Sequence, residues 1–279
     1  KDDWQCNTIP DVTCEDWLKA KQLPDGFIIG IDGRLVTVSN FDRFERAIRD
    51  AGGKLVSHSE NLLDKIWTCR QQQLPGKIWR MPKRFAGKTV VEKLDDLGRQ
   101  LQDKACEAVL ITRVDSVNWL VNMRGEDLLC TPIKLCFALF HLQTGLHVFG
   151  DEAGLRPVLG DAVRVLPLDS LPALLETMGE GRLMIETASL PRMMFEQILA
   201  SAVKTVKATC PIALAKACKN DAELDGFRAA HRRDGAAMVE FLCWLEKEMQ
   251  TLNTVFFESE IATKLQTFRQ KQEGFISPS

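Results

Sequence analysis

Two hydrophobic spacings alternate along the central part of the chain. Short runs of consecutive apolar residues, typical of buried strands, are separated by segments in which apolar residues recur every three or four positions, typical of amphipathic helices. This pattern predicts strands over 107–113, 134–142, 146–149, 163–166, 182–186 and 204–208, and helices over 89–104, 116–123, 171–178 and 192–201. Gly145 closes a tight turn between the second and third of these strands. We therefore predict an α/β fold in which a mixed β-sheet is flanked by helices.

The first 67 residues show the same alternation on a smaller scale. Strands are expected over 27–31, 35–38 and 54–57, the first two forming a hairpin around Asp32 and Gly33. Helices are expected from Thr13 to residue 23, from Ser39 or Asn40 to residue 52, and over 61–67. A unit this small, with unpaired strand edges, is not expected to fold alone.

Residues 68–87 have no clear hydrophobic period and contain Pro75, Gly76, Pro82 and Gly87. They also carry five basic residues and no acidic one. Two aromatic residues among these basic ones would suit a nucleic-acid strip. The net charge of the whole chain is -2, which favours a solvated linker instead.

The last part, 211–279, is predicted to contain two helices. Asn220 with Glu223 forms a capping box for a long helix to about Gln250, as Thr13 with Asp16 and Thr89 with Glu92 do for earlier helices. A second helix is expected over 260–272, capped by Ser259. Apolar residues at helical spacing predict a buried stripe on the long helix: Leu224, Phe227, His231, Met238, Phe241, Leu242 and Leu245. His231 is interpreted as a packed, hydrogen-bonded structural histidine.

A polar segment, D-S-V-N-W-L-V-N-M-R-G-E-D from Asp115 to Asp127, follows the first central strand. Asp115 is expected to cap the next helix, and Gly125 to end it in a left-handed conformation. Asn122, Arg124 and Asp127 would then surround a loop at the end of a strand, where open α/β sheets bind ligands. The alternative interpretation is that Arg124 and Asp127 only pair with each other and hold the loop.

Two motifs taken together identify a family. N-W-L-x-N-x-R-G-x-D at 118–127, followed by K-N-D-x-E-x-x-G-F-R-x-A-H-x-R-D-G from Lys219, resembles the long, three-domain aminopeptidase P proteins. These are Xaa-Pro aminopeptidases of the creatinase/prolidase superfamily. The resemblance implies a partial first creatinase-like domain at 1–67, a linker at 68–87 and a second such domain at 88–210. It implies that 211–279 holds the first helices of the pita-bread catalytic domain.

The resemblance implies hydrolysis of the bond between an N-terminal residue and a penultimate proline. The family uses two metal ions, usually manganese, to activate a bridging water. All five metal ligands lie beyond the helices just described, so we expect no catalytic residue and no metal ligand here, and no activity of the 279 residues alone. Asn122, Arg124 and Asp127 are the expected substrate-binding residues. The expected partners are peptides with a penultimate proline, and the parent is expected to form homodimers.

Two other functions stay open at this stage. The parent could be another enzyme of the superfamily, a prolidase or a creatinase. It could also be a non-catalytic binding protein that uses a peptidase-like domain. Sequence beyond Ser279 would separate these alternatives, because the five ligands either follow or do not.

Composition excludes several classes of partner and chemistry. The near-neutral charge gives no electrostatic case for nucleic acid, and no apolar run reaches the ~20 residues of a membrane span. The four histidines show no H-E-x-x-H spacing, and no G-x-S-x-G is present. Nine cysteines without a C-x-x-C pair predict reduced thiols and a cytoplasmic location.

Overall fold

The computed structural model describes residues 6–21, 23–70, 76–161, 163–250 and 255–276. Its centre is a six-stranded sheet in the order β10-β9-β4-β6-β7-β8. The strands are β4 Ala108–Ile111, β6 Phe137–His141, β7 Gly145–Phe149, β8 Arg164–Leu166, β9 Arg182–Ile185 and β10 Lys204–Lys207. β4 pairs with β9 in parallel and with β6 antiparallel, and β6 pairs with β7 antiparallel. The predicted mixed sheet is therefore confirmed, including the turn before Gly145.

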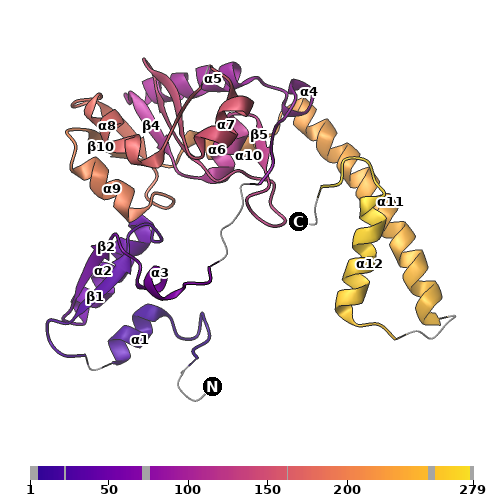
Figure 1. Cartoon of the computed structure of the whole chain (residues 1–279), viewed down its shortest axis with the longest axis horizontal. Helices are drawn as coiled ribbons and strands as arrows, with labels where there is room; N and C mark the ends of the chain where they lie inside the picture. The colour runs from indigo at the N-terminus through magenta and orange to yellow at the C-terminus, as the bar shows by residue number, and fades with distance from the viewer. Residues whose placement is uncertain (1–5, 22, 71–75, 162, 251–254, 277–279) are drawn as a thin grey trace.

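Helices cover both faces of this sheet (Figure 1). One face packs against α5 Val90–Asp103, α6 Val114–Leu120, α7 Glu152–Leu159 and α10 Pro211–Ala217, and the other against α8 Leu171–Glu176 and α9 Arg192–Leu199. Alternate strand residues enter opposite cores: Val109 and Ile111 face the first group of helices, and Leu110 the second. The inner strands β4, β6, β7 and β9 are buried on both faces because each side of the sheet has its own helical layer.

The segment predicted to be a linker contains regular structure. β3 Ile78–Arg80 pairs antiparallel with β5 Met123–Gly125, and α4 Lys83–Ala86 follows it. The segment expected to be a linker therefore includes a short strand and a short helix over 78–86, and residues 71–75 lie outside the described part. Three residues of extended backbone are too few to show a period, so the strand has no sequence signal of its own. The domain boundaries stay a prediction.

The N-terminal unit consists of α1 Cys14–Ala20, β1 Ile28–Asp32, α2 Val38–Asp50, β2 Lys54–His58 and α3 Leu62–Ile66. β1 pairs in parallel with β2. The strand predicted over 35–38, and its hairpin, are wrong, because Thr37 instead caps α2 and accepts from the Asn40 amide. The Thr13–Asp16 and Thr89–Glu92 capping boxes are confirmed.

Backbone hydrogen bonds attach this N-terminal unit to α9 and the turn before it. The Val38 amide donates to the Leu190 carbonyl at 2.9 Å, and the Arg192 amide donates to the Val36 carbonyl at 2.8 Å. The Val38 side chain is fully buried in the core on the α8–α9 side of the sheet. The small unit therefore completes the core of the larger one.

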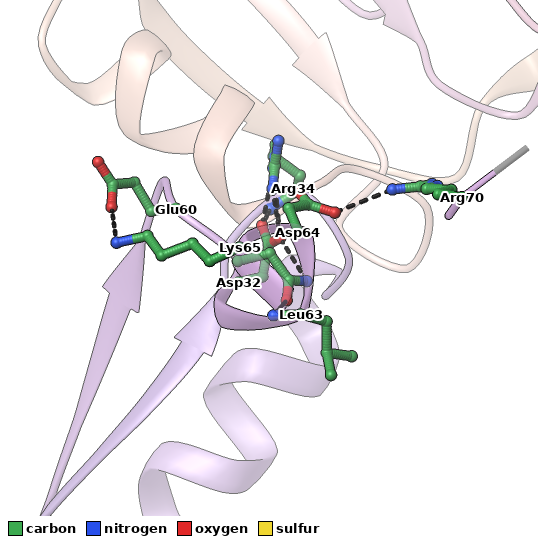
Figure 2. A network of polar contacts seen from close by, with 8 residues as sticks. Asp32, Arg34, Glu60, Leu63, Asp64, Lys65 and Arg70 are labelled. Carbon is green, nitrogen blue, oxygen red and sulfur yellow. Dashed lines mark hydrogen bonds and ion pairs between the residues drawn. The ribbon is translucent and has the colours of Figure 1, made fainter. Parts of the chain in front are cut away.

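A polar network fixes α3 against the turn after β1 (Figure 2). Arg34 contacts Asp32 at 2.7 Å and Asp64 at 3.4 Å, and Arg70 reaches Asp64 at 2.9 Å. The Asn61 amide donates to Asp32 at 3.1 Å. The hydrogen bonds from Arg34 lower the pKa of Asp32 to about 2. Asp32 at the end of β1 and Arg34 in the turn after it therefore hold the polar side chains of α3 in place.

The C-terminal part is an antiparallel pair of helices, α11 Asp221–Gln250 and α12 Glu258–Gln270, which extends from the α4 end of the molecule (Figure 1). Arg269 joins the two helices through two hydrogen bonds to Asp234, at 2.6 and 3.1 Å. The Ser259 cap is wrong, because Phe257 precedes the helix and its amide donates to Glu260. No helix among the described residues has the length and hydropathy to cross a membrane.

The predicted buried stripe on α11 is mostly wrong. Phe241 is buried, but Phe227 and Leu242 are each 52% exposed and His231 is exposed. Apolar period identifies one face of a helix, but a face is buried only where another element covers it. In the described part of the chain, α12 covers the face around Phe241.

Candidate functional site

The helix at the start of the first motif begins earlier than its sequence predicts. α6 starts at Val114, so Asp115 lies in its first turn and not at the N-cap, which is Arg113. The carboxylate of Asp115 instead forms an ion pair with Lys216 of α10. An acidic residue in the first turn still interacts favourably with the helix dipole. The predicted cap is therefore wrong, and the side chain serves to join α6 to α10.

Asn122, and not Gly125, ends the helix in the left-handed conformation. Its φ is 51°, and asparagine tolerates this region better than most residues. Gly125 lies in β5, where a Cβ atom would come within 3.0 Å of the Lys134 backbone nitrogen. The glycine eases this close approach of two backbones, and its own φ is not positive, so the predicted reason for Gly125 is wrong.

The Asn122 side chain is buried and has partners on two sides. Its amide nitrogen donates to the Lys88 carbonyl at 2.8 Å, and its oxygen accepts from the Lys93 ammonium at 2.7 Å. The left-handed turn is thereby bonded to the segment before α5 and to α5 itself. These contacts assign Asn122 a part in holding the loop.

Lys93 is the buried cation at the centre of this arrangement, with 3% of its surface exposed. Its ammonium also donates to the Trp119 carbonyl at 2.7 Å and lies 3.7 Å from the centroid of the Trp119 ring. Burial lowers the pKa of Lys93 to about 8. The carboxylate of Glu223 opposes that shift, and the charges of Arg124 and Lys88 add to it.

Trp119 and Glu223 connect the two sequence motifs in space. The indole nitrogen of Trp119 donates to Glu223 at 2.9 Å. Glu223 also completes the predicted capping box, since it accepts from the Asn220 amide and donates its own amide to Asn220, both at 3.0 Å. The capping was predicted, but the tryptophan contact was not. Its signal was present, because both residues belong to the motifs that identify the family.

Of the three predicted substrate-binding residues, Arg124 is half-buried, whereas Asn122 and Asp127 are buried. It lies in β5 opposite Trp79, and its guanidinium donates to the Met123 carbonyl at 2.7 Å. Burial lowers its pKa, and the charge of Glu223 opposes the shift. A guanidinium has five N–H donors, so this one retains donors for a peptide carbonyl or carboxylate.

Asp127 is 8% exposed and is engaged within the fold. Its carboxylate pairs with the buried Lys134 ammonium at 3.1 Å and accepts from the Leu135 amide at 2.9 Å and the Gly76 amide at 3.2 Å. The loop's acidic residue is therefore fixed to the segment that leads into β6. Whether Asn122, Arg124 and Asp127 bind a peptide stays a prediction.

Two cavities are lined in part by residues of the two motifs, and neither has Asn122, Arg124 or Asp127 in its wall. One, of about 250 Å³, lies between α5, α6, α10 and the start of α11, with Lys93, Trp119 and Glu223 in its wall. The other, of about 410 Å³, lies between the loop at Cys130 and the α11–α12 pair, and His231 and Arg233 line it. Within the described ranges, no group of three or more His, Cys, Asp or Glu residues could hold a metal ion. These residues do not fit a two-metal centre, and no catalytic step is assigned to them.

Comparison with known proteins gives a consistent result. Residues 70–223 match the creatinase/prolidase N-terminal domain. A probable Xaa-Pro aminopeptidase P of Paracoccidioides lutzii is 33% identical over 283 residues, covering 96% of this chain and 46% of the relative. The crystal structure of an X-prolyl aminopeptidase from Caenorhabditis elegans, a cytosolic enzyme with a di-nuclear active site, superposes with a TM-score of 0.83 at 27% identity. It covers 97% of this chain and 45% of that one.

A more distant structure, an Xaa-Pro dipeptidase of Bacillus anthracis, shares the fold with a TM-score of 0.50 at 14% identity, covering 66% of this chain and 49% of that one. The chain thus spans about half the length of the curated relatives it matches. The resemblance expected from the two motifs is confirmed.

Proposed function

Because the chain belongs to the creatinase/prolidase N-terminal domain family, with Xaa-Pro aminopeptidases P among its relatives, we propose that it is the N-terminal part of a metal-dependent Xaa-Pro aminopeptidase. The parent would release one N-terminal residue from peptides whose second residue is proline. The observation that carries the proposal is the similarity over 96% of the chain to proteins with this name.

The 279 residues would bind and position the peptide, and further residues would supply the chemistry. The described part of the chain contains no group of three or more His, Cys, Asp or Glu residues that could hold a metal ion. The relatives of this chain are about twice its length. The related worm enzyme has a di-nuclear active site, which supports two metal ions, manganese by our proposal, in the complete protein. A metal pair would lower the pKa of a bound water and polarise the scissile carbonyl. The same relative is cytosolic, which supports a cytoplasmic location.

The loop from Asn122 to Asp127 is proposed as the wall of the substrate cleft. Asn122 and Asp127 are fixed by buried partners, so they would act through the shape of the loop. Arg124 would be the residue that contacts the peptide, because it is partly exposed and has donors left. A rigid loop limits the entropy lost when a peptide is bound.

The test is an Arg124→Ala variant of the complete gene product. Turnover of a peptide beginning Arg-Pro-Pro should fall by a factor of ~10 or more. This is the effect expected from the loss of one pair of charge-assisted hydrogen bonds to the peptide. Metal content should stay unchanged. Arg84→Ala serves as the control, because Arg84 is exposed and its guanidinium stacks on the ring of its neighbour Phe85. Equal turnover in both variants would leave Arg124 without a role in substrate binding.

A further inference from the structure

The Glu223 side chain joins the second sequence motif to the first. One of its carboxylate oxygens accepts from the Asn220 amide at 3.0 Å, and the other accepts from the Trp119 indole at 2.9 Å. The bond to Asn220 is the one that a capping box requires. The bond to Trp119 is additional to the cap, and it connects α11 with a residue of α6 that lies 104 positions earlier in the chain.

A series of contacts leads from this indole to the loop. The Trp119 carbonyl accepts from the Lys93 ammonium at 2.7 Å, and the Lys93 nitrogen lies 3.7 Å from the centroid of the Trp119 ring. Lys93 also donates to the side-chain oxygen of Asn122 at 2.7 Å. Asn122 forms the left-handed turn after which β5 and Arg124 follow. The contacts of Glu223 therefore reach Arg124 through three intervening residues.

The charge of Glu223 supports the same series of contacts. Lys93 is held as an ammonium by two oxygen acceptors and the face of an aromatic ring, and it is 3% exposed. A buried cation is costly without a counter-charge. Burial lowers the pKa of both Lys93 and Arg124, and the carboxylate of Glu223 opposes the shift of each. Glu223 thus stabilises the charged form of Lys93 on which the contacts with Trp119 and Asn122 depend.

We propose that Glu223 is a positioning residue for substrate binding, which fixes the Trp119 indole and, through Lys93 and Asn122, the direction of the Arg124 guanidinium. This inference rests on the peptide contact of Arg124 proposed above. A guanidinium binds a peptide group through paired donors only when its plane is correctly oriented. Loss of the Glu223 carboxylate would therefore weaken peptide binding and leave the chemical step unchanged.

The first test measures KM and kcat of the complete gene product on Arg-Pro-Pro. Glu223→Ala and Trp119→Phe should each raise KM about threefold or more and leave kcat within about twofold, the pattern of lost uniform binding. Asn220→Ala is the matched control, because it removes the oxygen that accepts from the Glu223 amide and keeps the bond from Trp119 to Glu223. We expect its KM to stay within about twofold of the wild type. A rise in KM as large as that of Glu223→Ala would overturn the proposal, as would an unchanged KM in Glu223→Ala.

A double-mutant cycle separates the positioning of Arg124 from a general loss of stability. In the Arg124→Ala background the oriented guanidinium is absent, so Glu223→Ala should raise KM by no more than about 1.5-fold. The same rise in KM in both backgrounds would show that Glu223 acts independently of Arg124, and would contradict the proposal.

A second measurement does not depend on peptidase activity. In the 279-residue chain, Glu223→Ala and Trp119→Phe should speed amide hydrogen exchange several-fold over 122–125, whereas Asn220→Ala should leave it unchanged. The Met81 amide, which donates to the Asn122 carbonyl at 2.7 Å, reports on the same turn. Unchanged exchange at these amides in Glu223→Ala would overturn the inference even if the complete protein is an active peptidase. If the wild-type protein releases no arginine, the proposed function fails, and the exchange result alone decides whether Glu223 positions the loop.

Discussion

Replacing Asp127 with asparagine tests whether its carboxylate stabilises the fold or instead serves to bind substrate. The side chains of Asp127 and Lys134 are 8% and 6% exposed, and their closest charged atoms lie 3.1 Å apart. The substitution would leave the Lys134 ammonium buried without its main counter-charge. The backbone amides of Leu135 and Gly76 donate to different oxygens of the Asp127 carboxylate, so in asparagine one of them would face an NH2 group that cannot accept.

Removal of one partner from a buried ion pair typically costs about 3–5 kcal/mol. Asp151 lies 3.9 Å from Lys134 and partly compensates, which places the expected loss near the lower end, about 3 kcal/mol. The assay is urea unfolding of the 279-residue chain at neutral pH, with the free energy of unfolding taken from the midpoint and slope.

Asp225→Asn is the matched control for this substitution. Asp225 and its partner Arg228 are 75% and 65% exposed, so their pair should contribute at most about 1 kcal/mol. If Asp127→Asn destabilises the chain no more than Asp225→Asn does, the buried pair contributes little. The reasoning that fixes Asp127 within the fold would then be refuted.

Three further predictions follow from single contacts. Asp32 has its pKa lowered to about 2 from 3.8, so its stabilising effect is present above about pH 4 and is lost as the pH falls through 2; Asp32→Asn should remove this loss in thermal unfolding followed by circular dichroism. Trp119→Phe removes the donor to Glu223 and should cost about 1 kcal/mol, with faster amide hydrogen exchange in the first turn of α11; unchanged exchange would contradict it. Thiol titration under denaturing, non-reducing conditions should count nine free cysteines, and seven or fewer would show a disulfide.

The inner strands of the central sheet could be predicted because they are buried on both faces, and their apolar runs therefore stand out. The capping boxes were also visible, since each needs only two residues at fixed spacing. β3 and β5 were not, because each is three residues long and they pair across more than forty positions. The exposed apolar residues of α11 show a second limit of the sequence. Hydrophobic periodicity identifies the apolar face of a helix, but only tertiary contacts decide whether that face is buried.

The candidate site divides in the same way. The motifs located Asn122, Arg124 and Asp127, but their burial depends on partners that no spacing reveals. From its sequence position, Lys93 is an ordinary polar residue of an amphipathic helix. It becomes the centre of the site only because the left-handed turn at Asn122 brings two oxygens to its ammonium.

We propose that this chain is part of an enzyme that removes a residue preceding proline. The most direct measurement is release of arginine by the complete gene product, supplied with manganese, from two peptides that differ at one position, Arg-Pro-Pro and Arg-Ala-Pro. We predict release from the first, little from the second, and none by the 279-residue chain alone. Equal rates on both peptides, no release from either, or release by the 279-residue chain alone would contradict the account.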